Sequence, residues 1–288
     1  MPRLKIVGAG TPQRTPNRWG TCFLLEISGE WIMIDCGPAS TYKMYRMDVS
    51  PTDIDHLFFT HLHSDHIADY PCFLMTRFDQ SIGLEPDLRV FGPPPIKDLT
   101  ERIWSKTHGA FWDDVVARTK HPMSIHAFHN RGGSGDRPEP TIHVTEYGEG
   151  KVASGKTWDC YAREVKHAQP YINCFGFRFE TEEGVVAFSG DTAPTQSVID
   201  LARDADLLVQ EVVHREETIE KLPSRISETG SVGAAKMAAE AGVKRLVINH
   251  QNVRLEALDE MALAIKDISD IYSGPLYWAQ DFTEIDWS

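Results

Sequence analysis

The sequence lacks three features that would place it in a particular class of protein. None of its apolar runs reaches the about 18 residues of a membrane span. The amino-terminal stretch MPRLKIVGAG has no long apolar region of the kind found in secretory signals. The five cysteines are odd in number, scattered and without a CxxC pair, which argues against a disulfide framework and a zinc ribbon. We therefore expect a cytoplasmic protein with free thiols and no membrane segment.

Positive charge is also scarce. The chain has 42 acidic and 29 basic residues, a formal net charge of −13 at pH 7. Proteins that grip a nucleic-acid backbone usually show the opposite balance or a clear basic patch, and the sequence contains no such Lys/Arg cluster. We interpret the acidity as ordinary surface solubility, so nucleic acid is not the expected partner.

What the sequence does contain is a succession of short apolar runs separated by turns and helical stretches. The strand-like runs first meander and then alternate with helical segments, which predicts an α/β fold in one domain over residues 1–288. Segment 121–140 (HPMSIHAFHNRGGSGDRPEP) breaks all periodicity, so we expect an inserted flexible loop there. The main expected strands are 20–27, 30–35, 56–59, 87–91, 141–147, 157–166, 174–180, 184–189, 206–211, 244–249 and 275–279, and the expected helices are 39–47, 96–120, 195–204, 229–242 and 255–269.

The densest group of polar residues is THLHSDHIADY, residues 60–70, directly after the apolar run HLFF. It could be a polar turn that happens to be rich in histidine, or one half of a metal site. Loops that leave buried strands are where α/β folds place their chemistry, which favours the second interpretation. The candidate ligands in this stretch are His61, His63, Asp65 and His66.

Three later residues stand in the same position relative to an apolar run. His167 follows TWDCYAREVK, Asp191 follows VVAFSG and His250 follows KRLVIN. A single histidine after a strand is more often a hydrogen-bonded capping residue than a ligand, but three such positions together with the first group favour a dimetal centre. Imidazole and carboxylate ligands suit zinc, manganese or iron without any thiolate. Asp191 is the natural bridge, because its two oxygens can bind both ions.

The stretch HLHSDH resembles the HxHxDH signature of the metallo-β-lactamase superfamily, and the three later ligands match that superfamily in order. The resemblance extends over nearly the whole chain, from GAGTP to LYWAQDFTEI. It implies a four-layer αββα sandwich with the site at one edge. It also implies one ion held by His61, His63, His167 and Asp191, and a second held by Asp65, His66, Asp191 and His250.

Within that superfamily the sequence is most similar to the ribonuclease Z-like and arylsulfatase-like branch. The similar stretches are GAGTP, IDCGPAS, FGPPPI, SGDT, ADLLVQE and AGVKRLVINHQNVR. Glu211 matches a glutamate that assists phosphodiester cleavage, and Arg254 matches an arginine beyond the last histidine ligand. The chain departs from ribonuclease Z at Glu228, where that family usually has a histidine, and in the turn DCGPAST. Segment 121–140, which stands roughly where the tRNA-gripping arm would be, is not basic.

These observations predict a dinuclear metal-dependent hydrolase that uses a metal-bridging hydroxide on a small ester-type substrate: a phosphodiester, sulfate ester, lactone or carboxylic ester. The expected ions are two divalent metals, zinc in the first place and manganese or iron as alternatives. Asp65 would orient the nucleophile, and Glu211 or His214 would protonate the leaving group. Arg18 and Arg254 would clamp an anionic substrate.

Plainer interpretations remain beside these roles. Glu211 could be a solvent-facing carboxylate at a strand end, His214 a bystander, and Arg18 a partner in a surface salt bridge. The alternative functions are a ribonuclease Z-like endonuclease acting on tRNA 3′ ends, a non-hydrolytic di-iron redox protein, and a binding protein without turnover. Because exposed loops beside such sites often pack across a dimer, we also expect a homodimer.

Overall fold

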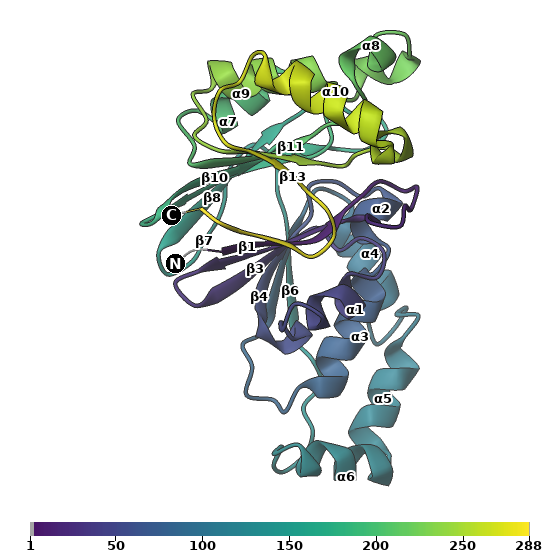
Figure 1. Cartoon of the computed structure of the whole chain (residues 1–288). Coiled ribbons are helices and arrows are strands. Elements are labelled where there is room, and N and C mark those ends of the chain that lie inside the picture. Colours follow the sequence, from purple (N-terminus) through teal and green to yellow (C-terminus); the bar gives the residue numbers. More distant parts are fainter. Residues whose placement is uncertain (1–2, 288) are drawn as a thin grey trace.

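The computed structural model describes residues 3–287 and contains two facing seven-stranded sheets (Figure 1). The first has the order β14-β1-β2-β3-β4-β5-β6, and the second has the order β13-β12-β11-β10-β9-β8-β7. The strands of the first sheet are β1 (Arg3–Ala9), β2 (Thr21–Ile27), β3 (Glu30–Ile34), β4 (Ile54–Phe58), β5 (Leu88–Gly92), β6 (Ile142–Glu146) and β14 (Thr283–Asp286). Those of the second are β7 (Gly150–Ser154), β8 (Trp158–Glu164), β9 (Phe175–Thr181), β10 (Gly184–Phe188), β11 (Leu207–Glu211), β12 (Leu246–Asn249) and β13 (Leu276–Trp278).

Each sheet has an antiparallel part and a parallel part. In the first sheet the hairpin β2–β3 turns at Ser28 and Gly29, whose φ angles of 49° and 78° are those that a two-residue hairpin turn requires. Strands β3, β4, β5 and β6 then run parallel to their neighbours, as do β10, β11, β12 and β13 in the second sheet. Parallel neighbours end at the same edge of a sheet, so the residues that follow them are brought together.

Helices cover the outer faces of both sheets (Figure 1). One apolar cluster fills the space between the sheets, and one further cluster lies under the helices on each side. This arrangement confirms the expected four-layer αββα sandwich. The helices beside the first sheet are α1 (Ser40–Tyr45), α2 (Ser64–Ile67), α3 (Tyr70–Gln80) and α4 (Ile96–Ile103), and those beside the second are α7 (Gln196–Leu201), α9 (Ser231–Glu240) and α10 (Leu258–Ser269). The short helix α8 (Glu216–Ile219) precedes α9, and single 3₁₀ turns span Pro51–Asp53, Pro223–Ile226 and Val253–Glu256.

Two helices project from the body as an arm, α5 (Trp112–Lys120) and α6 (Pro122–Asn130) (Figure 1). The expectation of a loop over 121–140 is therefore wrong for Pro122–Asn130. Pro122 occupies the first helical position, and the His121 side chain accepts a hydrogen bond from the Met123 amide at 3.3 Å, so the helix start is capped. The single helix expected over 96–120 is also wrong, because α4 ends at Ile103 and α5 begins at Trp112.

None of the helices in the described part of the chain has the length and apolar character needed to span a lipid bilayer.

Candidate metal centre

The ligands predicted from the sequence converge at one edge of the sandwich, where the strands of both sheets end. His61, His63, Asp65 and His66 follow β4, and helix α2 carries the last two of them. In the second sheet, Asp191 follows β10 and His250 follows β12. Both strands run parallel to β11, which lies between them. Strand β8 runs in the same direction as β10, because each pairs antiparallel with β9, so His167 reaches the same edge.

One glycine makes the approach of the ligand loop feasible. A Cβ atom on Gly37 would lie 2.0 Å from the carbonyl oxygen of Asp65 and 2.6 Å from the amide nitrogen of Thr21. No side chain fits at that spacing, so the DCGP turn needs glycine to let the loop pass. Asp35 and His250 each directly follow a strand, and their φ angles of 59° and 62° lie in the left-handed region. Such conformations cluster at functional sites.

The first group of ligands contains three imidazoles. Nδ1 of His63 lies 3.0 Å from Nε2 of His61 and 3.2 Å from Nε2 of His167. Oδ2 of Asp191 is 3.8 Å from Nε2 of His61 and 3.9 Å from Nε2 of His167. Nitrogen lone pairs this close repel one another unless a proton or a metal cation lies between them. The set therefore fits a metal ion.

The second group contains Asp65, His66, Asp191 and His250, all of them buried. Oδ2 of Asp191 lies 3.2 Å from Nε2 of both His66 and His250. Nε2 of His250 is also 3.1 Å from Oδ2 of Asp65. Asp191 thus belongs to the second group, and its Oδ2 also lies within 3.8–3.9 Å of two imidazoles of the first group, so it stands beside both. A donor set of nitrogen and oxygen without sulfur suits zinc, manganese or iron.

Outer hydrogen bonds fix the orientation of three of the imidazoles. Asp35 accepts from Nδ1 of His66 at 2.8 Å, and from the amide and the hydroxyl of Thr60, each at 2.8 Å. Since the Thr60 hydroxyl donates to Asp35, its oxygen accepts from Nδ1 of His61 at 3.1 Å. Nδ1 of His167 donates to the carbonyl oxygen of Ser227 at 2.8 Å. In each case the proton is held on Nδ1, which leaves the Nε2 lone pair directed at the ion position.

These outer partners are functional residues that the sequence analysis missed. Asp35 directly follows the strand EWIMI, so the rule that found Asp191 and His250 could have found it too. It meets Thr60 because β3 and β4 are parallel neighbours. Ser227 contributes a backbone carbonyl, a group that any residue carries, so no signal in the sequence marks it.

The electrostatics of the centre favour a cation. Burial lowers the pKa of His61 well below its ordinary value, so this ligand is neutral. Burial acts in the same direction on His66, but the carboxylates of Asp191 and Asp35 outweigh it and raise its pKa well above the ordinary value. Burial would raise the pKa of Asp191, yet His250 and His66 hold it well below the usual range. The same negative potential that attracts a proton to His66 attracts a divalent ion.

Glu211 lies behind the ligands rather than among them. It is 1% exposed, Oε2 accepts from the Thr192 amide, and Oε1 stands 3.8 Å from Nδ1 of His250. Neither Oε1 nor Nδ1 of His250 has a hydrogen-bond partner among residues 3–287. Burial, together with the charges of Asp191 and Glu228, raises the pKa of Glu211 well above its ordinary value.

The remaining candidates occupy different surroundings. Arg18 is buried and donates from Nε to the carbonyl oxygen of Ala279 at 2.8 Å and from Nη1 to Glu256, so its guanidinium is committed to the fold. His214 is buried too, and burial followed by the nearby charge of Arg254 lowers its pKa. Arg254 itself is exposed.

Glu228, the position where the chain departs from ribonuclease Z, faces the centre. The backbone on both sides of it is tied down, because Ser227 accepts from His167 and the Thr229 hydroxyl donates to the carbonyl oxygen of Thr192. The half-buried carboxyl group feels the charges of His250, Asp191, His167 and Asp65, and burial raises its pKa. The carboxyl group itself makes no hydrogen bond or ion pair within residues 3–287, whereas the Glu228 amide donates to the carbonyl oxygen of Ser224 at 2.9 Å.

Replacing Asp35 by asparagine is expected to weaken metal binding about 10- to 100-fold, because the amide cannot accept all three hydrogen bonds that hold His66 and Thr60. Competition with a chromophoric chelator measures the change. Asp55→Asn on β4, a half-buried aspartate outside the ligand groups, is the control. An unchanged metal affinity in Asp35→Asn would show that the ring of His66 is oriented without Asp35.

Comparison with known proteins gives consistent results at three levels. A family model described as "Anti-Pycsar protein Apyc1" matches residues 2–225. A curated relative, ribonuclease Z from Mycobacterium marinum (strain ATCC BAA-535 / M), is 29% identical over 261 residues, which cover 87% of this chain and 86% of the relative.

Two solved structures share the fold over almost their whole length. The metallo-β-lactamase fold protein YhfI from Bacillus subtilis superimposes with a TM-score of 0.75 at 17% identity, covering 99% of this chain and 100% of YhfI. A diphosphatase from the PhnP family superimposes with a TM-score of 0.69 at 13% identity, covering 100% of this chain and 98% of the diphosphatase. At these identities the likeness establishes the common fold.

Proposed function

We propose that the substrate of this protein is a small phosphodiester. The chain belongs to the family of the anti-Pycsar protein Apyc1 and to the metallo-β-lactamase superfamily of metal-dependent hydrolases. The observation that carries the proposal is the pair of adjoining ligand groups, with Oδ2 of Asp191 3.2 Å from His66 in one and 3.9 Å from His167 in the other. Two ions held in this way suit an in-line displacement at phosphorus, where charge develops on both the attacking and the leaving oxygen. The relative named a ribonuclease and the neighbour named a diphosphatase support phosphorus chemistry over sulfate esters, lactones and carboxylic esters.

The ligand groups would hold two divalent ions, with zinc as the first candidate, and such ions lower the pKa of water and offset charge on phosphoryl oxygens. Around them, Asp65 fixes His250 through its contact with Nε2, and Glu211 lies at the other nitrogen of the same ring. We therefore assign Glu211 to the orientation of His250 rather than to proton transfer. With Nε2 of His250 directed at the ion position, Nδ1 carries the ring proton, and Oε1 of Glu211 is the acceptor that faces it.

We assign the protonation of the leaving group to Glu228. Its carboxyl group is half-buried, has no hydrogen-bond or ion-pair partner among residues 3–287, and interacts electrostatically with residues of both ligand groups. Burial raises the pKa of Glu228 and so favours its protonated form, which can give its proton to a departing alkoxide. His214 is the second candidate for the proton donor. Burial and the nearby charge of Arg254 lower its pKa, so its imidazole is neutral at pH 7 and a weaker source of a proton.

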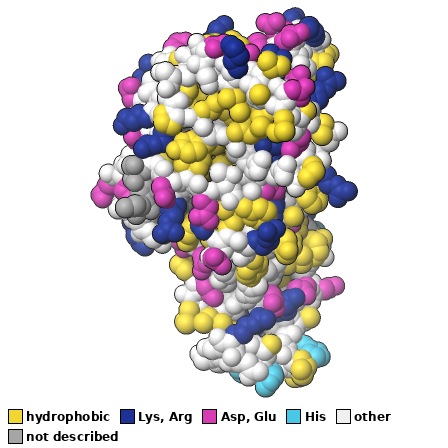
Figure 2. All heavy atoms as spheres, in the orientation of Figure 1, with side chains coloured by type: hydrophobic (Ala, Val, Ile, Leu, Met, Phe, Trp, Pro, Cys, Tyr) yellow, Lys and Arg dark blue, Asp and Glu magenta, His cyan; other side chains and the backbone are white. Residues whose placement is uncertain are grey.

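Charge supports a small substrate over an RNA chain. Four carboxyl groups stand at or beside the ion positions: Asp65, Asp191, Glu211 and Glu228. On the face shown in Figure 2, Lys and Arg side chains are interspersed with Asp and Glu and form no continuous basic stripe. A polyanion gains little from such a surface. A compact diester with one negative charge can approach the ions while avoiding most of the repulsion.

A substrate panel tests this proposal on protein of measured metal content. We expect turnover of bis(p-nitrophenyl) phosphate and of a 3′,5′-cyclic mononucleotide, both compact phosphodiesters, and little turnover of an aryl sulfate or a lactone. A precursor tRNA is included because ribonuclease Z relatives favour endonuclease activity as the second candidate. Preferred cleavage of that RNA, with a steep dependence on salt, would replace the small-diester proposal.

Replacing Glu228 by glutamine is expected to separate substrates by their leaving group. A diester that releases an alkyl alcohol needs a proton donor, so its kcat should fall about 100-fold. Release of p-nitrophenolate needs little protonation, so bis(p-nitrophenyl) phosphate should lose only a few-fold in rate. Glu217→Gln on α8, an exposed glutamate nearby in the chain, is the matched control. Equal losses for both substrates would assign Glu228 a role other than proton donation.

A further inference from the structure

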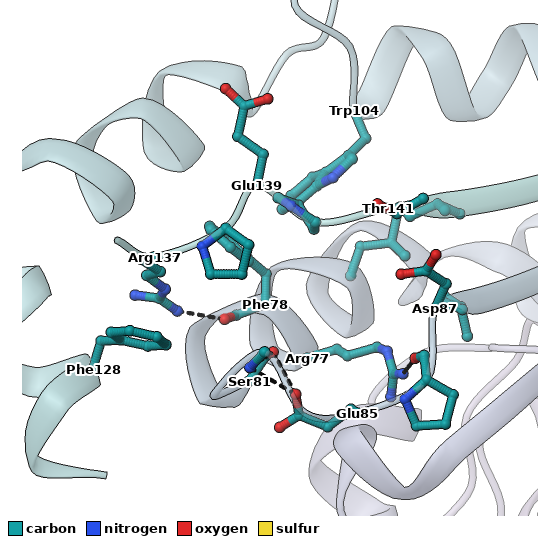
Figure 3. A pocket seen from close by; sticks show the side chains of 17 residues that line it. Arg77, Phe78, Ser81, Glu85, Asp87, Trp104, Phe128, Arg137, Glu139 and Thr141 are labelled. Atoms are coloured by element: carbon teal, nitrogen blue, oxygen red, sulfur yellow. Dashed lines mark hydrogen bonds between the residues drawn. The ribbon is translucent and has the colours of Figure 1, made fainter. Parts of the chain in front are cut away.

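A cavity lies at the base of the arm, and its lining includes none of the seven candidate metal ligands. Its volume is about 180 Å³. Its walls come from the end of α3, the segment 81–88, Trp104, the arm residue Phe128 and the segment 137–142 (Figure 3). The metal chemistry does not use this space, and it stands where the arm joins the body.

The walls of the cavity combine aromatic and apolar side chains with charged ones. Phe78 and Trp104 pack edge to face with their ring centroids 5.9 Å apart. The guanidinium of Arg137 lies between two rings, 4.5 Å from the centroid of Phe78 and 5.5 Å from that of Phe128 (Figure 3). Leu74, Leu88 and Ile142 complete the apolar part. Flat walls of this kind favour a planar ligand.

Two hydrogen-bond donors in the lining have no partner. Nε1 of Trp104 and Nε of Arg137 are buried, and neither has an acceptor among residues 3–287. Trp104 is 8% exposed and Arg137 is 6% exposed. Burying a donor without an acceptor is costly, and buried polar groups without a protein partner commonly meet a ligand or water. Both side chains line the cavity, so a molecule in it that carries acceptor oxygens would lie beside these two N–H groups.

The buried charges of the lining are positive. Arg77 donates to the carbonyl oxygens of Pro51 and Pro86, both at 2.7 Å, and Arg137 donates to those of Phe78 and Asp79. Neither arginine forms an ion pair within the described residues. An unpaired buried guanidinium gains most from an anion.

The carboxylates of the lining have other partners. Glu85 accepts from the Ser81 hydroxyl and from the amides of residues 82–84. Asp87 pairs with His143 and Glu139 with Lys106, and the side chains of Asp87 and Glu139 are about half exposed at the rim. Their negative charge at the entrance opposes a second charge on the ligand. A monoanion fits this distribution better than a dianion.

We propose that this cavity is a binding site for a small planar aromatic molecule with one carboxylate. The ring would lie against Phe78 and Trp104, and the carboxylate would accept from Nε1 of Trp104 and face the guanidinium of Arg137. The occupant would contact the body through α3 and the arm through Phe128 at the same time. This site is independent of the hydrolytic reaction and of the substrate proposed above.

Benzoate is the probe for the test, with calorimetric titration of the metal-loaded protein as the measurement. We expect binding with a Kd of about 1 mM or tighter. Trp104→Phe keeps the ring and removes the N–H, and it should weaken binding at least about fivefold. Ile142→Phe places a larger side chain on the β6 wall of the cavity and should also weaken the binding of benzoate. Thermal unfolding of each variant establishes that the fold is intact.

The controls separate this cavity from other sites. Trp31→Phe on β3 and His63→Ala in the metal centre should both leave benzoate binding unchanged, and the second excludes binding of the carboxylate to the ions. Benzamide, which lacks the charge, should bind at least about tenfold more weakly, and inorganic phosphate should not compete. The proposal is overturned if benzoate does not bind at about 10 mM, if Trp104→Phe binds it as well as the unaltered chain, or if benzamide binds equally.

Discussion

Replacing Asp191 by asparagine is expected to lower kcat/KM at least about 10³-fold. One oxygen of this carboxylate lies within 3.2–3.9 Å of imidazole nitrogens from both ligand groups, so no other residue can take over its position between the two groups. The amide is neutral and offers one acceptor in place of two anionic oxygens. Loss of the shared ligand should therefore remove both the second ion and most of the charge that balances the pair.

The measurement is metal content by mass spectrometry together with the rate on bis(p-nitrophenyl) phosphate. Asp259→Asn, an exposed aspartate in the first turn of α10, should retain both metal and activity. An Asp191→Asn variant that kept two ions and a rate within tenfold of the original would contradict the bridging role.

Replacing Phe58 by alanine is expected to lower the free energy of unfolding by about 3–5 kcal/mol. Phe58 is fully buried at the end of β4 and touches both sheets. Its ring stacks on Phe91 of the first sheet at 4.6 Å between centroids, and it meets the edges of Phe177 and Phe179 of the second sheet at 5.7 and 5.4 Å. The rest of the ring cluster comes from rigid strands, so the cavity left by the substitution cannot close well.

Urea denaturation followed by fluorescence gives the shift in midpoint. Tyr171→Ala is the comparison, because a side chain that is 91% exposed should change stability by no more than about 0.5 kcal/mol. A loss below about 1 kcal/mol for Phe58→Ala would mean that the sheets repack around the gap.

The sequence was informative wherever a local pattern decided the structure. Apolar runs bounded by turn residues located most strands. The ligand-type side chains after those runs come together in the candidate metal centre, because parallel strands end at the same edge. Helix α6 was missed because the glycines and prolines of 132–140 dominated the segment, although His121 and Pro122 form an ordinary helix start. Helix α3 and strands β7 and β14 were also not predicted.

Long-range features could not be predicted in this way. Strand β14 pairs with β1 across nearly the whole length of the chain, and nothing local marks that partner. The cavity at the base of the arm is built from five separate segments, each of which is unremarkable alone. Arg18, expected to clamp a substrate, instead meets Glu256 and the Ala279 carbonyl, and both partners lie more than 230 positions along the chain.

The division of the ligands between the sheets makes metal binding part of the folding equilibrium. Four ligands belong to the first sheet, and His167, Asp191 and His250 belong to the second, so each ion position is complete only while the sheets face each other. An ion that binds the folded chain alone adds RT ln(1 + [ion]/Kd) to its stability, about 4 kcal/mol at 1,000 times Kd. The concentration of free metal around the protein thus sets the free energy of unfolding of the chain as well as the rate of hydrolysis.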